Sequence, residues 1–459
     1  MVDKKHKDNL NFSKAFVGGE SQYIFWDGVT KVMSFINSFF IFKSLNLYQY
    51  GVFQLLLSFQ DISSEFLATG SSVATVEMGR LIGARKEAEA KRLFVDYNKF
   101  KFIFSFLIWS LLFFGIDFLD AKYDNSFRFL VKLISILFLT EVFLGTLRSL
   151  LRLRLFFDLD ARRNSNYKTA QMFFLGFFYF TTGLEIKTII MSMIFGSVIT
   201  SISLLTGARK AFGFWSDVKM SNQPVLMKLF LNYGKWDIIR RFFVRANVRM
   251  LPWLIKLFIN TEAVGIYSVA SSMVGIIKNF IGTRTLATLI TRRLDDEILL
   301  KTVFGFGMKY FSMASFLAMS ASWVVVPMVV KIFFPQYLAV LPFFYILSLN
   351  LPFKSFGHIL GIFLIAYQKQ KFMFFQKMLS AGLNLLLLVL FLPLFGLWGL
   401  VVPEVLIDVL LTYISYKYVI GFKPAFALSR KMFFTYTDDD RALFSLVYKN
   451  LRGLYWKAL

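Results

Sequence analysis

Long apolar segments recur from one end of this chain to the other, and they limit its fold more than any other feature. Each is about 20 residues long, the length that an α-helix needs to cross the hydrocarbon core of a bilayer. Hydrophobic residues make up 57% of the 459 residues, and 58 are phenylalanine, whereas soluble domains average about 45–50% apolar residues. The sequence therefore predicts an all-α integral membrane protein that crosses the membrane many times.

We predict twelve transmembrane helices from these segments. Their ranges are residues 22–42, 50–74, 102–120, 129–147, 169–183, 188–207, 236–258, 264–290, 304–330, 338–366, 378–395 and 397–420. Lys and Arg test this number, because the cytosolic loops of membrane proteins carry an excess of both. With the N-terminus in the cytosol, thirty-five basic residues fall in cytosolic segments and only five in outer loops. This asymmetry predicts that both termini are cytosolic.

The first and seventh predicted helices are similar, which indicates an internal repeat. FWDGVTKVMSFIN aligns without a gap with KWDIIRRFFVRAN. Each helix leads to a short loop and then to a glycine with a nearby tyrosine, Gly51 in the first half and Gly265 in the second. Since six helices separate the copies, they share one orientation, as the parallel repeats of some transporters do. The alternative is chance similarity between apolar segments.

The repeat predicts two six-helix lobes joined by cytosolic segments. The predicted parts are a cytosolic N-terminal segment at 1–21, an N-terminal lobe at 22–208, a cytosolic linker at 209–235, a C-terminal lobe at 236–420 and a cytosolic interfacial tail at 421–459. The first segment lacks the apolar core and the cleavage site of a signal peptide, so we expect it to remain attached.

Twelve basic residues lie inside the predicted spans, and seven of them are in the seventh and eighth helices. A charge at bilayer depth is costly and usually functional. At about 100° per residue, Arg241, Arg245, Arg249 and Lys256 form one stripe along the seventh helix, which favours a water-filled cavity lined by cations. The alternatives are an amphipathic helix on the membrane surface and arginines neutralised by buried carboxylates.

Such a stripe suits an anionic substrate, because guanidinium groups bind phosphate oxygens with paired hydrogen bonds. Lys278 and Arg284 of the eighth helix suit either the same surface or a packing role. The candidate substrate-binding residues are Arg241, Arg245, Arg249, Lys256, Lys278, Arg284 and Lys31.

Four acidic residues in the first half are candidates for coupling transport to an ion. They are Asp61, Glu65, Glu141 and Asp27. Asp61 and Glu65 are one helical turn apart and share a face, so they suit a structural role as counter-ions to Lys31 or the arginines as well as titration. Asp27 also suits a role at the start of its helix, because Asp237 occupies the equivalent position in the repeat.

Several classes of function are disfavoured. The sequence has no phosphate-binding loop, dinucleotide-binding motif or metal-ligand cluster, and it contains two histidines and no cysteine. We therefore expect no enzyme activity, no metal and no cofactor, with energy from a proton or sodium gradient or from consumption of the product. The formal charge of +24 does not indicate nucleic acid as a partner, because most basic residues serve membrane orientation.

Three segments carry a resemblance to a known family, namely LYQYGVFQLLLSF, AVGIYSVASSMVGII and NLLLLVLFLPLFGLWGL. The chain resembles the multidrug/oligosaccharidyl-lipid/polysaccharide (MOP) exporter superfamily, and within it the O-antigen (Wzx-type) lipid-linked oligosaccharide flippases. The resemblance implies a MATE-like fold, with two six-helix lobes around a central cavity, and alternating access. For the flippase branch it implies a cationic cavity that holds an undecaprenyl-pyrophosphate-linked oligosaccharide.

The same resemblance implies a bacterial inner membrane location. The partners implied are the lipid-linked oligosaccharide, membrane lipids, and polysaccharide polymerase and chain-length proteins. One alternative is a multidrug exporter or cation antiporter of the same superfamily, against which the arginines inside the spans argue. The other is a membrane glycan polymerase or ligase, against which the short and nearly uncharged outer loops argue.

Replacing Arg245 and Arg249 with Ala is expected to abolish export of the glycan, because both guanidinium groups lie in the deep part of the stripe. Surface polysaccharide on intact cells measures the effect, and membrane fractionation checks that the variant is inserted. Normal surface polysaccharide in the double variant would remove the role of the stripe.

Overall fold

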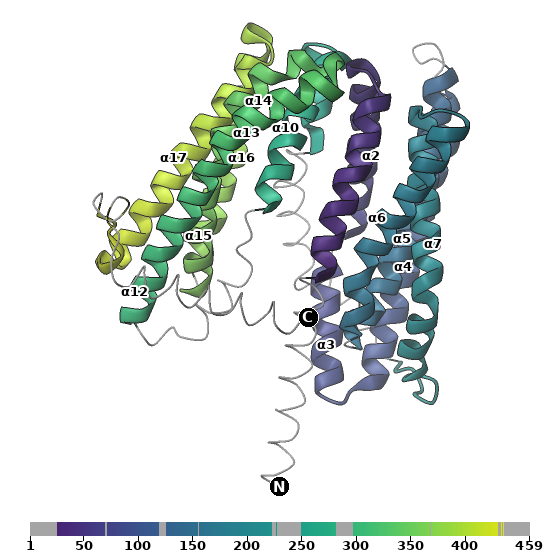
Figure 1. The fold of residues 1–459 in the computed structure, drawn as a ribbon. Helices are drawn as coiled ribbons and strands as arrows, with labels where there is room; N and C mark the ends of the chain where they lie inside the picture. The colour runs from purple at the N-terminus through teal and green to yellow at the C-terminus, as the bar shows by residue number, and fades with distance from the viewer. Residues whose placement is uncertain are drawn as a thin grey trace, which may run out of the picture. The chain divides into compact units, whose positions relative to one another are not determined.

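The structure is a computed structural model, and it describes residues 25–68, 71–118, 125–154, 156–222, 226, 249–280, 297–367, 369–429, 433 and 435. Every regular element in these ranges is helical, which confirms the all-α prediction (Figure 1). Within them, seven helices are long and apolar enough to cross a membrane. The protein is therefore a multi-pass membrane protein. The number of twelve spans stays a prediction, since most of the seventh span lies outside the described ranges.

The chain divides into two compact units. The first unit is Met1–Ser268 with Phe333–Tyr337, and the second is Val269–Ile332 with Leu338–Leu459. The lobe boundaries expected from the sequence stay a prediction.

In the first unit, residues 25–44 and 249–258 are helical. Its other elements are α2 (Leu47–Ala68), α3 (Ser71–Gly83), α4 (Glu87–Gly115), η1 (Ile116–Phe118), α5 (Asn125–Leu153), α6 (Phe157–Thr181), α7 (Ile186–Gly213) and the first two turns of α10 (Thr261–Phe280). Helix α5 packs against α4, α6 and α7, and the four lie side by side in Figure 1. Leu93, Leu151 and Trp215 are fully buried in their shared core.

The second unit contains the rest of α10 and the helices that follow it. These are α12 (Glu297–Phe306), η3 (Gly307–Phe311), α13 (Ser312–Phe333), η4 (Pro335–Val340), α14 (Leu341–Ser348), α15 (Asn350–Ala366), α16 (Gln370–Phe395), α17 (Trp398–Phe422) and η5 (Pro424–Phe426). Helix α17 packs against α14, α15 and α16.

Two spans expected to be single helices are interrupted. The span at 304–330 contains the π-helical turn η3 between α12 and α13. The span at 338–366 begins in the 3-10 helix η4 and breaks at Leu349, between α14 and α15. Both interruptions change the backbone hydrogen-bond pattern without changing polarity. Hydropathy therefore cannot detect them.

The basic segments expected as loops after the second and fourth spans are largely helical, which corrects the sequence interpretation. Helix α4 begins at Glu87, and α6 begins at Phe157. Acidic residues occupy both first turns, Glu87 and Glu89 in α4 and Asp158 and Asp160 in α6. Negative charge near a helix N-terminus is favourable, so these helices begin well before the apolar segments do.

Gly51 of α2 and Gly265 of α10 bring two helix backbones into contact. A Cβ atom on Gly51 would lie 2.0 Å from the carbonyl oxygen of Thr261, and one on Gly265 would lie 2.1 Å from that of Leu47. The contact is reciprocal, because each glycine meets the residue four positions before the other. Glycine permits this close approach between membrane helices. The two glycines occupy equivalent positions of the repeat predicted from the sequence, which stays a prediction.

Replacing Gly51 with Ala is expected to lower the free energy of unfolding by about 1–3 kcal/mol. The new methyl group would overlap main-chain atoms, which cannot turn aside as a flexible side chain does. Thermal unfolding of the purified protein measures the change. The matched control is Gly275→Ala on α10, where a Cβ meets nothing within 4 Å. Equal effects of the two substitutions would show that the crossing is not tight.

Candidate functional site

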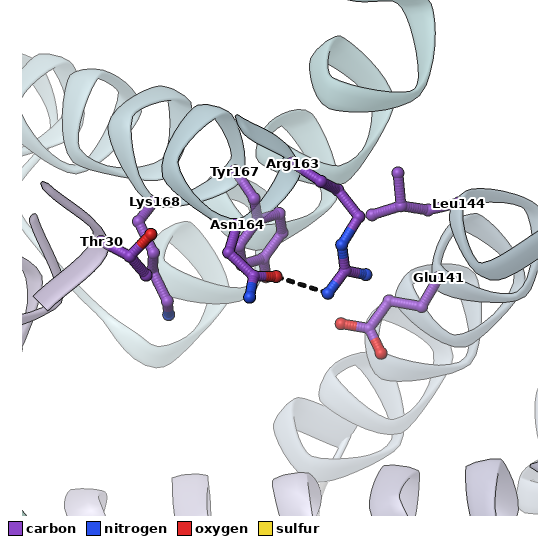
Figure 2. A pocket seen from close by; sticks show the side chains of 7 residues that line it. All are labelled: Thr30, Glu141, Leu144, Arg163, Asn164, Tyr167 and Lys168. Carbon is purple, nitrogen blue, oxygen red and sulfur yellow. Dashed lines mark hydrogen bonds between the residues drawn. The ribbon is translucent and has the colours of Figure 1, made fainter. Parts of the chain in front are cut away.

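A pocket of about 410 Å³ opens among three helices of the first unit. The helices are the one at residues 25–44, α5 and α6. The lining side chains, drawn in Figure 2, are Thr30, Glu141, Leu144, Arg163, Asn164, Tyr167 and Lys168. Two cations, one carboxylate and three uncharged polar groups therefore share one cavity, which is the candidate functional site.

Helical spacing places the α6 side chains on one face. Tyr167 follows Arg163 by four residues and Asn164 by three, and Lys168 follows Asn164 by four. Residues three and four positions apart lie together on a helix. The sequence interpretation placed these residues in a cytosolic loop and so missed them as candidates. The spacing of polar residues in RNSNYK is the pattern that indicates such a helix face.

The two pocket cations hydrogen-bond to amides. Arg163 donates to the side-chain oxygen of Asn164, and Lys168 Nζ donates to Gln171 Oε1 at 3.1 Å. Within the described part of the chain, neither cation forms an ion pair with a carboxylate. There, the buried Nε of Arg163 and the buried hydroxyl of Tyr167 also have no hydrogen-bond partner. The pocket thus holds more donors than the surrounding protein satisfies.

Glu141 is the one acidic residue that lines the pocket. Its Oε2 accepts a 2.8 Å hydrogen bond from Gln60 Nε2 of α2. Figure 2 shows its carboxylate turned toward the guanidinium of Arg163. The ion-coupling role predicted for Glu141 stays a prediction, but the structure places the residue in the polar cavity.

Asn37 joins two walls of the pocket. Its side-chain nitrogen donates to the carbonyl of Lys168 at 3.0 Å and to Gln171 Oε1 at 3.3 Å. Asn37 is 2% exposed, and a buried hydrogen bond of this kind is costly to break. It holds the helix at 25–44 against α6.

Asp160 joins α6 to the third wall, α5. Its carboxylate accepts hydrogen bonds from Arg148 Nε at 2.9 Å and Arg152 Nε at 2.5 Å, both on α5. The Asp160 side chain has no exposed surface. Because Asp160 precedes Arg163 by one helical turn, these ion pairs hold the part of α6 that carries the pocket cations.

The described end of the seventh predicted span, residues 249–258, carries two cations of the predicted stripe. Arg249 forms an ion pair with Asp61 of α2. Lys256 Nζ lies 5.5 Å from the centroid of the Trp253 ring, within the range of a cation–π contact. Arg249 is thus neutralised by a carboxylate, one of the alternatives that the sequence left open.

The other predicted site residues are dispersed. Lys31 forms a 3.2 Å ion pair with Asp27 on its own helix, and Lys278 is exposed in the last turn of α10, in the second unit. Predicted positions outside the described residues are Arg241, Arg245 and Arg284, together with the side chain of Glu65. The substrate-binding and ion-coupling roles of all these residues stay predictions.

A separate charged cluster lies in the second unit, on α15 and α17. Lys354 Nζ is 3.4 Å from Glu404 Oε1 and 3.2 Å from Asp408 Oδ2. The two carboxylates are four residues apart and share a helix face. Mutual neutralisation in an apolar helix pair explains this cluster as a structural contact.

A family model described as polysaccharide biosynthesis protein matches residues 21–290, more than half of the chain. The chain belongs to this family. The matched range includes every helix that lines the pocket. A comparison with curated proteins finds no match for this member of the polysaccharide biosynthesis family.

Solved structures with the same fold belong to transporters of the MOP superfamily. An inward-facing multidrug resistance MATE family transporter aligns with a TM-score of 0.67 and 14% identity, covering 86% of this chain and 95% of that chain. A MOP superfamily transporter from Pyrococcus furiosus aligns with a TM-score of 0.55 and 13% identity, covering 90% and 97%. The lipid II flippase MurJ, in an inward closed conformation, aligns with a TM-score of 0.56 and 13% identity, covering 96% and 93%. These matches confirm the MATE-like fold of this polysaccharide biosynthesis protein.

Replacing Asp61 with Asn is expected to destabilise the protein, because Arg249 keeps its charge and loses its carboxylate. The free energy of unfolding is measured for Asp61→Asn, Arg249→Gln and the double variant. The resulting cycle should give a coupling energy of about 0.5–1 kcal/mol, since both side chains are partly exposed. Fully additive effects would contradict the ion pair.

Proposed function

We propose that this member of the polysaccharide biosynthesis family is a flippase. Its substrate is an undecaprenyl-pyrophosphate-linked oligosaccharide, the repeat unit of O-antigen or another surface polysaccharide. By alternating access it moves this lipid from the cytosolic to the outer leaflet of the bacterial inner membrane. The observation that carries the proposal is a pocket that two cations and a single acidic residue line, in a family member that has a transporter fold.

The pocket favours an anionic and polar substrate. Arg163 and Lys168 donate hydrogen bonds to amide side chains, and Glu141 is the one acidic residue that lines the pocket beside these two cations. A bound anion supplies the missing negative charge. A related fold is also present in a lipid II flippase, which supports a lipid-linked substrate here.

We propose that the seventh predicted helix binds the pyrophosphate group of the substrate through its cations. Arg249 already pairs with Asp61. A phosphate group that binds Arg249 therefore takes the place of the Asp61 carboxylate. The released Asp61 carboxylate then requires a proton or a sodium ion for neutralisation. We propose this exchange as the route by which an ion gradient is coupled to transport.

Two other functions are weaker. An exporter of cationic drugs is supported by the fold of the MATE transporter, but Arg163 and Lys168 repel a cationic ligand. A glycan polymerase or ligase is supported by the family description alone, and the solved structures that share the fold are of transporters and a flippase. We propose that the polymerase and chain-length proteins are partners of this chain.

Deletion of the gene is expected to abolish surface polysaccharide and to accumulate the lipid-linked repeat unit in the cytosolic leaflet, because the unit is made but not moved. Surface glycan staining and periodate accessibility of the lipid-linked unit measure the two effects, and the wild-type gene restores both. Altered chain length with continued export would indicate a polymerase. Drug sensitivity with normal surface polysaccharide would indicate a multidrug exporter.

A further inference from the structure

We propose that the pocket among residues 25–44, α5 and α6 binds a sugar that carries a carboxylate, such as a hexuronic acid residue of the translocated oligosaccharide. This inference rests on the proposed flippase function and adds the chemical class of the sugar. It assigns the pyrophosphate and the sugar to different parts of the first unit.

The size of the pocket fits a sugar ring. Its volume of about 410 Å³ lies within the range of small-molecule sites, about 300–1,000 Å³. A single phosphate or carboxylate group would leave most of this space unfilled. The ligand therefore carries additional atoms beyond its anionic group.

The mixture of charges distinguishes a sugar acid from a phosphate. Arg163 and Lys168 can only donate hydrogen bonds, whereas the Glu141 carboxyl group offers acceptor oxygens. A phosphate dianion offers no hydrogen-bond donor to the acceptor oxygens of Glu141. A hydroxylated carboxylic acid satisfies both requirements, because its carboxylate accepts from the cations and its hydroxyl groups donate to Glu141.

The uncharged polar groups fit the same ligand. The buried Tyr167 hydroxyl has no partner within the described ranges, and Asn164 and Thr30 also line the cavity. In Figure 2, Arg163 and Glu141 lie at one side of the pocket and Lys168 and Thr30 at the other. Polar groups spread in this way can contact several positions of one ring, which a small inorganic anion cannot.

The test uses the full chain reconstituted in liposomes with two synthetic probes. Both are undecaprenyl-pyrophosphate-linked disaccharides, and they differ only in a terminal glucuronic acid or glucose. Because charge-assisted hydrogen bonds are about twice as strong as neutral ones, we expect the wild-type protein to move the glucuronic acid probe about tenfold faster at limiting probe concentration.

Two variants separate the pocket from general charge effects. The double variant Arg163→Gln, Lys168→Gln should bring the ratio of the two rates to about one. The matched control is Arg162→Gln, which removes an exposed arginine of the same helix that does not line the pocket and should keep the preference. Equal rates in the wild type, or an unchanged ratio in the double variant, would overturn the proposal.

A binding measurement distinguishes failure of this inference from failure of the flippase function. If the wild type moves neither probe, the flippase function fails, and binding of methyl glucuronide and methyl glucoside to the purified protein then tests the pocket alone. Stronger glucuronide binding that the double variant loses supports the pocket assignment, whereas equal or absent binding refutes it. If the double variant does not give a cooperative unfolding transition, Lys168→Gln alone takes its place.

Discussion

The free-energy cost of a charge inside an apolar helix bundle shapes this structure more than any single contact. Two described cations illustrate how this cost is offset, because Arg249 pairs with Asp61 and Lys354 pairs with two carboxylates. Because the charges in such a pair neutralise each other, the pair indicates a structural role more readily than a functional one. Arg163 and Lys168 instead donate hydrogen bonds to amide side chains and line a pocket together with Glu141. The cavity that these side chains line, rather than the number of cations, therefore locates the candidate site.

The fold was largely predictable because it depends on polarity and length. Apolar segments of membrane-spanning length predict helices, and the described residues contain only helical elements. The interruptions at η3 and at Leu349 were not predictable, since they leave the apolar character of the segment unchanged. The early start of α6 was missed for the opposite reason. Its first turns are charged, and a hydropathy argument assigns charged segments to loops even where a helix continues beyond the bilayer.

The candidate site was predictable only in part. Glu141 was identified because an isolated acid in an apolar segment is unusual, and it lines the pocket. Arg163 and Lys168 were among the basic residues that the sequence analysis assigned to cytosolic loops. Their position there was explained by membrane orientation, so no binding role was considered for them. The partner of Arg249 could not be chosen from sequence, because Asp61 and Glu65 share a helix face and both suit an arginine. Spatial proximity between distant helices is the information that a single sequence lacks.

The crossing of Gly51 and Gly265 also limits how this protein can change. In most packed interfaces, a residue that grows larger can be accommodated by a smaller residue opposite. Here each glycine faces main-chain atoms of the other helix, and neither position has a side chain left to remove. No compensating exchange of side-chain volume exists at this contact. A second-site suppressor of a substitution at either glycine must therefore alter the course of a helix, and it will map away from the crossing itself.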